Sequence, residues 1–242
     1  MRSGISVVIP TLNEEAVIER GVRQFEPYRE ETPIEVIVSD DGSVDSTVTV
    51  AERWTDRVVS NGKAPRGRSA ALNRGASAAR YSTLLFLDAD IRISPMEGFL
   101  REVRGEFDAN PKVVGAMMDY SVYPELETSG DWITHRAWNA VMRAVHATTG
   151  IGLCTPGFQM AKRSSFDRIG GYDESMRLIQ DVEFSFRLSR IGRIHYFKQA
   201  RILESPRRYR DEGYVVYFWR SLLRWIHLLL WRKSYGEYRC VR

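Results

Sequence analysis

Two aspartates one residue apart, Asp88 and Asp90, follow the apolar segment 83–87. A buried strand that ends in this way presents both carboxylates in the next loop. Such a pair can hold a hard divalent cation, Mg²⁺ or Mn²⁺, and leave coordination positions free for the phosphate oxygens of a substrate. Aspartates also form ordinary turns. The pair alone therefore predicts either a metal site or a turn.

Polar residues follow two other apolar segments. Asp40 comes directly after the segment 34–39, and its carboxylate could accept hydrogen bonds from the N–H groups of a nucleobase. The segment 5–10 is followed by Asn13 and Glu14. Asn13 is expected to cap the next helix and Ser164 a later, short one, because their side chains can accept from free backbone N–H groups.

The elements that must position these residues alternate between strand and helix. Strands are expected at 5–10, 34–39, 58–59, 83–87, 113–120 and 158–162, and helices at about 46–54, 68–79, 132–149, 164–169 and 180–191. This pattern predicts an α/β fold, with a mostly parallel central sheet flanked by helices. Ligands of such sheets bind where the strands end. No GxGxxG motif follows the first strand, which argues against a nicotinamide or flavin site, and the P-loop motif is absent too.

Three segments together resemble the family-2 glycosyltransferases of the GT-A fold: ISVVIPTLNEE at 5–15, VSDDGSVDST at 38–47 and LFLDAD at 85–90. The resemblance spans about residues 4–205. It implies inverting transfer of a sugar from a nucleotide-diphosphate donor. It also implies a GT-A domain at 1–205, with a nucleotide-sugar half at 1–120 and an acceptor half at 121–205.

The resemblance assigns roles at the donor side. Thr11, Glu14 and Asp40 would line the nucleoside pocket, with Pro10 and Asn13 beside them. Arg68 would approach the base or the diphosphate. Asp88, Ala89 and Asp90 would lie at the ribose and at the diphosphate bridged by the metal.

An inverting displacement to a hydroxyl also needs a base that takes the acceptor proton. The family often places it in a Glu-Asp pair at the start of a helix, and the matching stretch here is LIQDVEF at 178–184. Asp181 is therefore the candidate base, although Gln180 stands where Glu is common. Glu183 is the second candidate, and either carboxylate could instead be a solvated residue of a first helical turn.

Residues on the acceptor side match the family less specifically. Gly171 and Tyr172 would form part of the acceptor wall or a plain turn. Arg207 and Arg208 would reach the pyrophosphate or belong to a solvated charge run.

Composition limits the other possibilities. The chain has 242 residues, 43% of them hydrophobic and 27% charged, which is typical of a globular protein. Its two cysteines, Cys154 and Cys240, form no zinc or disulfide pattern and favour a reducing compartment. No signal-peptide pattern precedes the first strand, so a cytoplasmic protein is expected.

Basic residues concentrate near the C-terminus. Residues 198–242 contain eleven Lys or Arg against four Asp or Glu, whereas the whole chain has a net charge of only +4. Residues 206–242 are expected to form a helical extension with an apolar helix at 214–231. Arg220, Arg224 and His227 make a polar stripe that opposes membrane spanning. The helix is therefore expected either to lie on the cytoplasmic face of the membrane or to pack on the domain or a second subunit.

The partners expected are a nucleotide-sugar, UDP- or GDP-linked, and a glycan or lipid-linked acceptor, without nucleic acid. Two alternatives stay open. The acceptor could be a polyprenyl phosphate, which is already anionic and needs no base. The chain could also be a non-catalytic peripheral module on an α/β scaffold, but this would not explain three polar strand ends in family order.

Overall fold

A computed structural model of the chain describes residues 2–62, 64–152, 157–176, 178–214, 216–217, 219–220 and 223. Both cysteines, Thr155, Pro156 and most of the expected C-terminal helix lie outside the described residues, as does the side chain of Arg208.

The strands and helices follow the alternating order expected from the sequence. The strands are β1 (Arg2–Thr11), β2 (Ile34–Asp40), β3 (Arg57–Ser60), β4 (Tyr81–Leu87), β5 (Arg92–Ser94), β6 (Val113–Val122), β7 (Phe158–Lys162) and β8 (Arg193–Glu204). The helices are α1 (Ile18–Arg23), α2 (Thr47–Ala51), α3 (Arg68–Ala78), α4 (Met96–Glu102), α5 (Ser129–Thr149), α6 (Arg163–Ile169), α7 (Gln180–Ser189) and α8 (Arg207–Glu212). A 3-10 turn, η1 (Glu26–Tyr28), and a π-helical turn, η2 (Val103–Asp108), complete the described elements.

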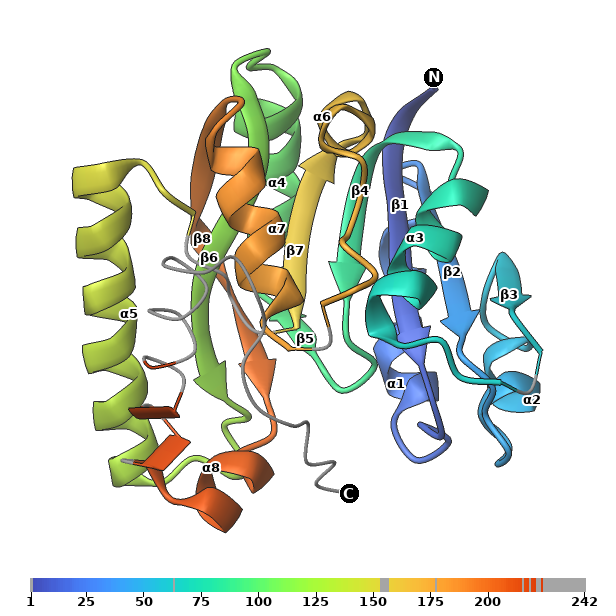
Figure 1. Ribbon diagram of the computed structural model, residues 1–242, viewed down its shortest axis with the longest axis horizontal. Coiled ribbons are helices and arrows are strands. Elements are labelled where there is room, and N and C mark those ends of the chain that lie inside the picture. The colour runs from blue at the N-terminus through green and yellow to red at the C-terminus, as the bar shows by residue number, and fades with distance from the viewer. Residues whose placement is uncertain are drawn as a thin grey trace.

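All of these strands form one sheet in the order β3-β2-β1-β4-β7-β6-β8-β5. β3, β2, β1 and β4 are parallel neighbours, and β6 and β8 are a second parallel pair. β7 is antiparallel to both β4 and β6, and β5 is antiparallel to β8. The prediction of an α/β fold with a mostly parallel sheet is confirmed, and the antiparallel β7 joins the two halves of the chain in one sheet (Figure 1).

Alternation along the strands builds a hydrophobic core on each face of the sheet. In β4, Leu85 and Leu87 belong to one core, and Leu84 and Phe86 belong to the other. The first core is covered by α1, α2 and α4, and the second by α3, α6 and α7. Because both faces of β4 are covered, residues 84–87 of this strand form a continuous hydrophobic run and do not alternate with polar residues.

The C-terminal ends of β1, β2 and β4 meet at one edge of the sheet, the lower edge in Figure 1. Thr11 at the end of β1 is level with Asp40 at the end of β2. The three polar segments identified in the sequence therefore lie beside one another.

Two expected helix caps are wrong. Asn13 has a positive φ of 58°, whereas an N-cap residue has extended backbone angles, and the helix begins only at Ile18. Asn13 instead accepts from the backbone N–H of Val44 and donates its own N–H to Ser43 Oγ, so it fastens the loop after β1 to the loop after β2. The cap of α6 is Lys162, and Ser164 lies inside that helix.

The segment 92–108 contains elements that periodicity did not indicate. β5 is only three residues long, and it is followed by α4, which continues into η2. Among the described residues, no helix is sufficiently long and apolar to cross a membrane.

Candidate active site

The loop that follows β4 carries Asp88, Ala89 and Asp90 in a tight turn. The N–H of Asp88 donates to the Gly157 carbonyl at 2.9 Å, and the Asp88 carbonyl accepts from Ile91 N at 3.1 Å. Helix α1 supports the loop from below through Gly21, where a Cβ would lie only 2.3 Å from the Ala89 carbonyl oxygen. The backbone therefore fixes both ends of the acidic turn and leaves its carboxylates at the edge of the sheet.

The acidic side chains at this edge repel one another. The pKa of Asp90 is raised to about 6 by burial, by the neighbouring Asp88 and by Glu204. The pKa of Glu14 is raised to about 7 by burial, by Asp90 and by Asp88. Arg207 lowers both pKa values but does not offset these effects. A positive charge placed among these groups would therefore be stabilised.

Asp88 and Asp90 fit a hard divalent cation by their chemistry. Both ligands are carboxylates, and their mutual repulsion is the energy that a bound cation would relieve. The part of the chain that the structure describes holds no group of three or more His, Cys, Asp or Glu arranged around a metal position. A divalent cation with only two carboxylate ligands keeps further coordination positions for non-protein oxygens.

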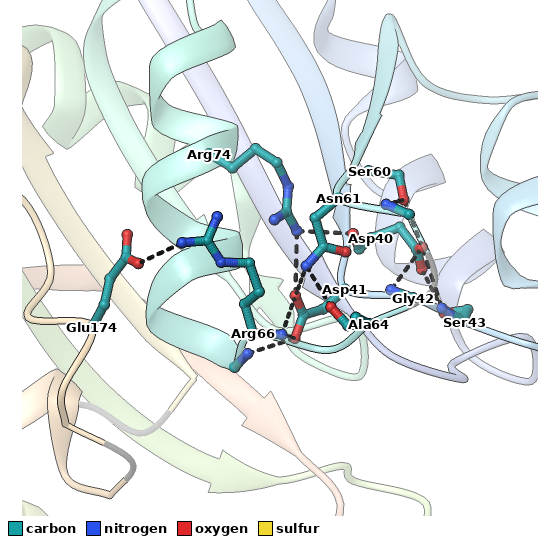
Figure 2. A network of polar contacts seen from close by, with 12 residues as sticks. Asp40, Asp41, Gly42, Ser43, Ser60, Asn61, Ala64, Arg66, Arg74 and Glu174 are labelled. Atoms are coloured by element: carbon teal, nitrogen blue, oxygen red, sulfur yellow. Dashed lines mark hydrogen bonds and ion pairs between the residues drawn. The ribbon is translucent and has the colours of Figure 1, made fainter.

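The carboxylates of Asp40 and Asp41, at the end of β2, accept hydrogen bonds from other residues of the chain (Figure 2). Asp40 is 2% exposed and accepts from the N–H groups of Gly42 and Ser43 and from Ser60 Oγ, at 3.0 to 3.3 Å. These bonds form a turn, and they engage the carboxylate that was expected to contact a nucleobase. The carbonyl of Asp40 accepts from Arg74 at 2.8 Å.

Asp41, which the sequence did not single out, organises the loop between β3 and α3. Its carboxylate accepts from the backbone N–H groups of Arg66 and Gly67 and from the side chain of Asn61, at 2.7 to 3.1 Å. Arg74 lies 3.5 Å away as a counter-charge. Because Gly67 precedes Arg68 directly, Asp41 fixes the position from which the Arg68 side chain starts.

The remaining residues expected near the donor lie at the end of β1 and in the turn that follows. Pro10 and Thr11 pair with Ser39 and Asp40 in the sheet, and the Thr11 carbonyl accepts from Asp41 N at 2.9 Å. The backbone N–H of Glu14 donates to Thr47 Oγ1 at 2.7 Å. Pro10, Thr11 and Asn13 thus build the frame between β1 and β2, whereas Glu14 adds a carboxylate to the acidic edge.

Arg68 joins the acidic turn to the candidate base. Its Nε and Nη2 donate to Asp88 Oδ1 at 3.1 and 2.7 Å, and its Nη1 donates to Asp181 Oδ1 at 2.5 Å. Burial raises the pKa of Asp181, and Arg68 opposes that rise. The negative charge of Asp88 adds to the rise in this pKa. Asp181, at the start of α7, therefore lies next to the candidate metal site.

Glu183, the second candidate base, is engaged elsewhere. It forms an ion pair with Arg187 one turn along α7, in which Arg187 Nη2 donates to Glu183 Oε2 at 2.7 Å. Of the two carboxylates, only Asp181 contacts Arg68, which favours it as the base.

The expectation for Tyr172 is corrected. Tyr172 is 2% exposed and its ring stacks on Phe184, with the centroids 4.2 Å apart, so it belongs to the core and does not form an acceptor wall. Gly171 has a φ of +71° and lies against Asn73, which holds the Tyr172 backbone from both sides. Arg207, the first residue of α8, acts electrostatically on Glu14 and Asp90.

Two further residues at the acidic turn carried no recognisable sequence signal. Glu204, at the end of β8, is buried and raises the pKa of Asp90. The Tyr123 hydroxyl donates to the Asp90 carbonyl, and its ring lies 4.6 Å from the guanidinium carbons of both Arg20 and Arg92. The electrostatic effect of Glu204 and the hydrogen bond of Tyr123 arise only from the tertiary fold.

A sequence model of Glycosyl transferase family 2 matches residues 6–170. The chain belongs to this family. The match covers all three strand ends that build the acidic edge, whereas Asp181 and Arg207 lie beyond it.

Comparisons with individual proteins agree with this assignment. The chain is 30% identical over 199 residues to glycosyltransferase AglD of Haloferax volcanii. The aligned region covers 78% of this chain but only 31% of that protein. The fold matches a mannosyltransferase from Pyrobaculum calidifontis in complex with GDP-Man and Mn²⁺, with a TM-score of 0.65, 20% identity and coverage of 92% of this chain and 65% of that one. It also matches glucosyl-3-phosphoglycerate synthase from Mycobacterium tuberculosis in complex with Mn²⁺, UDP and phosphoglyceric acid, with a TM-score of 0.61, 22% identity and coverage of 97% and 80%. The GT-A fold of the family is thus established for this chain.

Proposed function

We propose that this chain transfers a sugar, with inversion and metal assistance, from a nucleotide-diphosphate sugar to an acceptor hydroxyl. The observation that carries this proposal is the gathering of Glu14, Asp88, Asp90 and Asp181 at the sheet edge of a family-2 fold, with Arg68 and Arg207 beside them. Carboxylates with raised pKa values at such an edge are typical of a functional site.

The residues divide the chemistry between them. Asp88 and Asp90 would hold the cation, Mg²⁺ or Mn²⁺, which supplies a Lewis acid for the leaving diphosphate when bound. Asp181 would take the proton of the acceptor hydroxyl while that oxygen bonds to the anomeric carbon. The bond from this carbon to the diphosphate oxygen breaks, and its electron pair leaves with the nucleoside diphosphate. The raised pKa of Asp181 suits this role, because it makes the carboxylate a stronger base.

The donor base and sugar can be identified by binding. The related structures contain GDP-Man or UDP, so both nucleotides belong in the test. We expect one UDP- or GDP-sugar to raise the melting temperature in the presence of Mn²⁺, corresponding to about 2.7 kcal/mol at a hundredfold excess over Kd. Release of the nucleoside diphosphate in the presence of acceptor would establish transfer. The proposal fails if no nucleotide-sugar stabilises the protein with either metal.

A specific surface supports a lipid-linked or membrane-proximal acceptor at the cytoplasmic face of the membrane. The large hydrophobic side chains that are exposed at the start of α5 and beyond α8 are Leu126, Trp132, Ile133, Val216, Trp219 and Leu223. Arg210 of α8 donates to Asp131 of α5 at 2.8 Å and also to the Leu126 carbonyl, which ties the two segments together. Apolar side chains with flanking arginines are typical of a membrane-surface contact.

Vesicle flotation tests this contact. We expect the protein to bind vesicles of anionic lipid, and we expect Trp132→Ser to weaken this binding. A protein that binds neither anionic nor neutral vesicles would contradict the proposed contact. A polyprenyl phosphate acceptor is the alternative at such a surface. Because its phosphate is already anionic, transfer that survives Asp181→Asn would favour it over a hydroxyl acceptor.

A further inference from the structure

Arg68 contacts two carboxylates to which the proposed function gives different roles. Asp88 would be a cation ligand, and Asp181 would be the base for the acceptor. Arg68 donates twice to Oδ1 of the first and once to Oδ1 of the second. All three side chains are partly buried, with exposed fractions of 24% for Arg68, 35% for Asp88 and 19% for Asp181.

The Asp88 contact cannot persist unchanged when a divalent cation uses the same oxygen. A guanidinium and a metal ion on one carboxylate oxygen repel each other strongly, because the screening of charges by water is reduced at a partly buried site. Arg68 and a cation therefore compete for Asp88.

Only the side chain of Arg68 has to move in this competition. Its backbone begins α3, and the preceding Gly67 N–H is held by Asp41 at 2.7 Å. A guanidinium released from Asp88 has another partner near the acidic turn once a diphosphate is present, since Arg binds phosphate oxygens in a bidentate manner.

We propose, resting on the function proposed above, that Arg68 is a positioning residue that couples donor binding to release of the base. In the donor-free protein it pairs with Asp88 and Asp181 together. When a cation and a nucleotide diphosphate bind, Arg68 leaves Asp88 for the phosphates, and Asp181 Oδ1 becomes free for the acceptor hydroxyl. The base is thus covered until the donor is present, which imposes an order of donor before acceptor.

Binding of Mn²⁺ alone, without nucleotide, tests the coupling directly. Arg68→Met removes the competitor, so we expect Mn²⁺ to bind about threefold more tightly or better. Among the described residues, Asp181→Asn leaves Arg68 with Asp88 as its one ion-pair partner, so we expect weaker Mn²⁺ binding. The double variant should bind Mn²⁺ as Arg68→Met does, because Asp181 acts on the cation through Arg68.

Arg187→Met is the matched control. It removes an arginine that is paired with a carboxylate on α7, yet Arg187 contacts Glu183 and the Ile169 carbonyl and neither Asp88 nor Asp181. We expect it to leave the Mn²⁺ affinity within about twofold of the wild type. Arg68→Lys, which keeps the charge but cannot span two carboxylates with a planar fork, should fall between the wild type and Arg68→Met.

The outcomes separate this inference from the proposed function. A wild-type protein that binds neither Mn²⁺ nor any nucleotide-sugar contradicts the proposed function. A wild-type protein that binds both, together with an Arg68→Met affinity that is unchanged or weaker, overturns the coupling alone. Additive effects in the double variant overturn it as well. If Arg68→Met does not fold, as judged by its thermal unfolding, Arg68→Lys and Asp181→Asn decide the question.

Discussion

Two pairs of aspartates, one at the end of β2 and one after β4, have similar sequence contexts but different surroundings. Asp40 and Asp41 follow one buried strand, and Asp88 and Asp90 follow another strand of the same sheet. The first pair is surrounded by hydrogen-bond donors of the chain, which come from six nearby residues and from Arg74. The second pair has Arg68 as its ion-pair partner, and the pKa of Asp90 is raised to about 6.

This difference shows what makes a carboxylate available to a ligand. A buried carboxylate that accepts several N–H bonds is stabilised in its charged form and has little to gain from a cation. A partly buried carboxylate beside other acids is destabilised in its charged form, and a cation relieves this cost. The pair after β2 therefore stabilises the fold, and the pair after β4 can bind.

The largest effect is expected for Asp90→Asn on sugar transfer. The substitution removes a charged cation ligand, so we expect the rate of nucleoside diphosphate release to fall by about 10²–10³-fold. A discontinuous assay with the best donor and Mn²⁺ measures this loss. Asp45→Asn, at an acid of the loop after β2, is the control that should keep most of the activity. Full activity of Asp90→Asn would contradict the conclusion that the aspartates after β4 bind a cation needed for transfer.

The opposite variant, Asp41→Asn, is expected to lower the free energy of unfolding. Its buried carboxylate loses its charge, and the new amide N–H₂ faces the N–H donors of Arg66 and Gly67. Arg74 keeps its bond to the Asp40 carbonyl but loses its charged partner. Breaking such a buried pair costs about 3 kcal/mol. Urea unfolding at constant pH measures the change. An Asp41→Asn protein as stable as the wild type would mean that the loop does not depend on this carboxylate.

The positions of both aspartate pairs at the sheet edge could be predicted from local sequence, but the partners of each carboxylate could not. The strand ends are local features, because apolar runs stop at polar residues, and the sheet then aligns them by parallel pairing. The pairing of Arg68 with Asp181 joins positions that are 113 residues apart, and no spacing rule predicts it. Asn13 was misread as a cap because its role depends on Ser43 and Val44 in another loop, and the backbone angle that this requires is visible only in the structure.

Tyr172 and Asp41 show the same limit. Tyr172 lies in a glycine-rich turn, where exposure was expected, but it stacks on Phe184 from a helix that comes later in the chain. Asp41 stands beside Asp40 in the same motif, and only the positions of Asn61, Arg66 and Gly67 decide which of the two carboxylates holds the loop before α3. The sequence locates such acids at the sheet edge, and tertiary contacts then determine which of them remain available.

A stability gain of intermediate size is expected for Asp90→Asn in the absence of metal. A pKa raised from 3.8 to about 6 means that the folded state binds the proton more tightly than the unfolded state. The contribution of Asp90 to stability is thus fully present below pH 3.8 and is lost as the pH rises through about 6. At pH 7.5 the neutral variant avoids this loss, and we expect a gain of about 1 to 2 kcal/mol, discounted from the full shift because water reaches part of the carboxylate.

Thermal unfolding of the two proteins at pH 7.5 and pH 4.5 checks this expectation. The difference between them should shrink at the lower pH, where the wild-type Asp90 takes up its proton in the folded state. Mn²⁺ should raise the melting temperature of the wild type more than that of the variant. A variant that is less stable than the wild type at pH 7.5 would show that the Asp90 carboxylate is satisfied by the chain, as Asp41 is.

The smallest effect is expected for Tyr123→Phe, which tests how the acidic turn is held in place. The substitution removes the hydroxyl that donates to the Asp90 carbonyl and keeps the ring beside Arg20 and Arg92. Loss of one hydrogen bond is worth about 1 kcal/mol, so Mn²⁺ affinity should fall by about fivefold with little change in the fold. Tyr81→Phe, at a tyrosine at the opposite end of β4, is the matched control. Equal Mn²⁺ affinity in Tyr123→Phe and the wild type would mean that Gly157 and Gly21 alone fix the turn, and the pair after β4 would then owe its geometry entirely to the backbone.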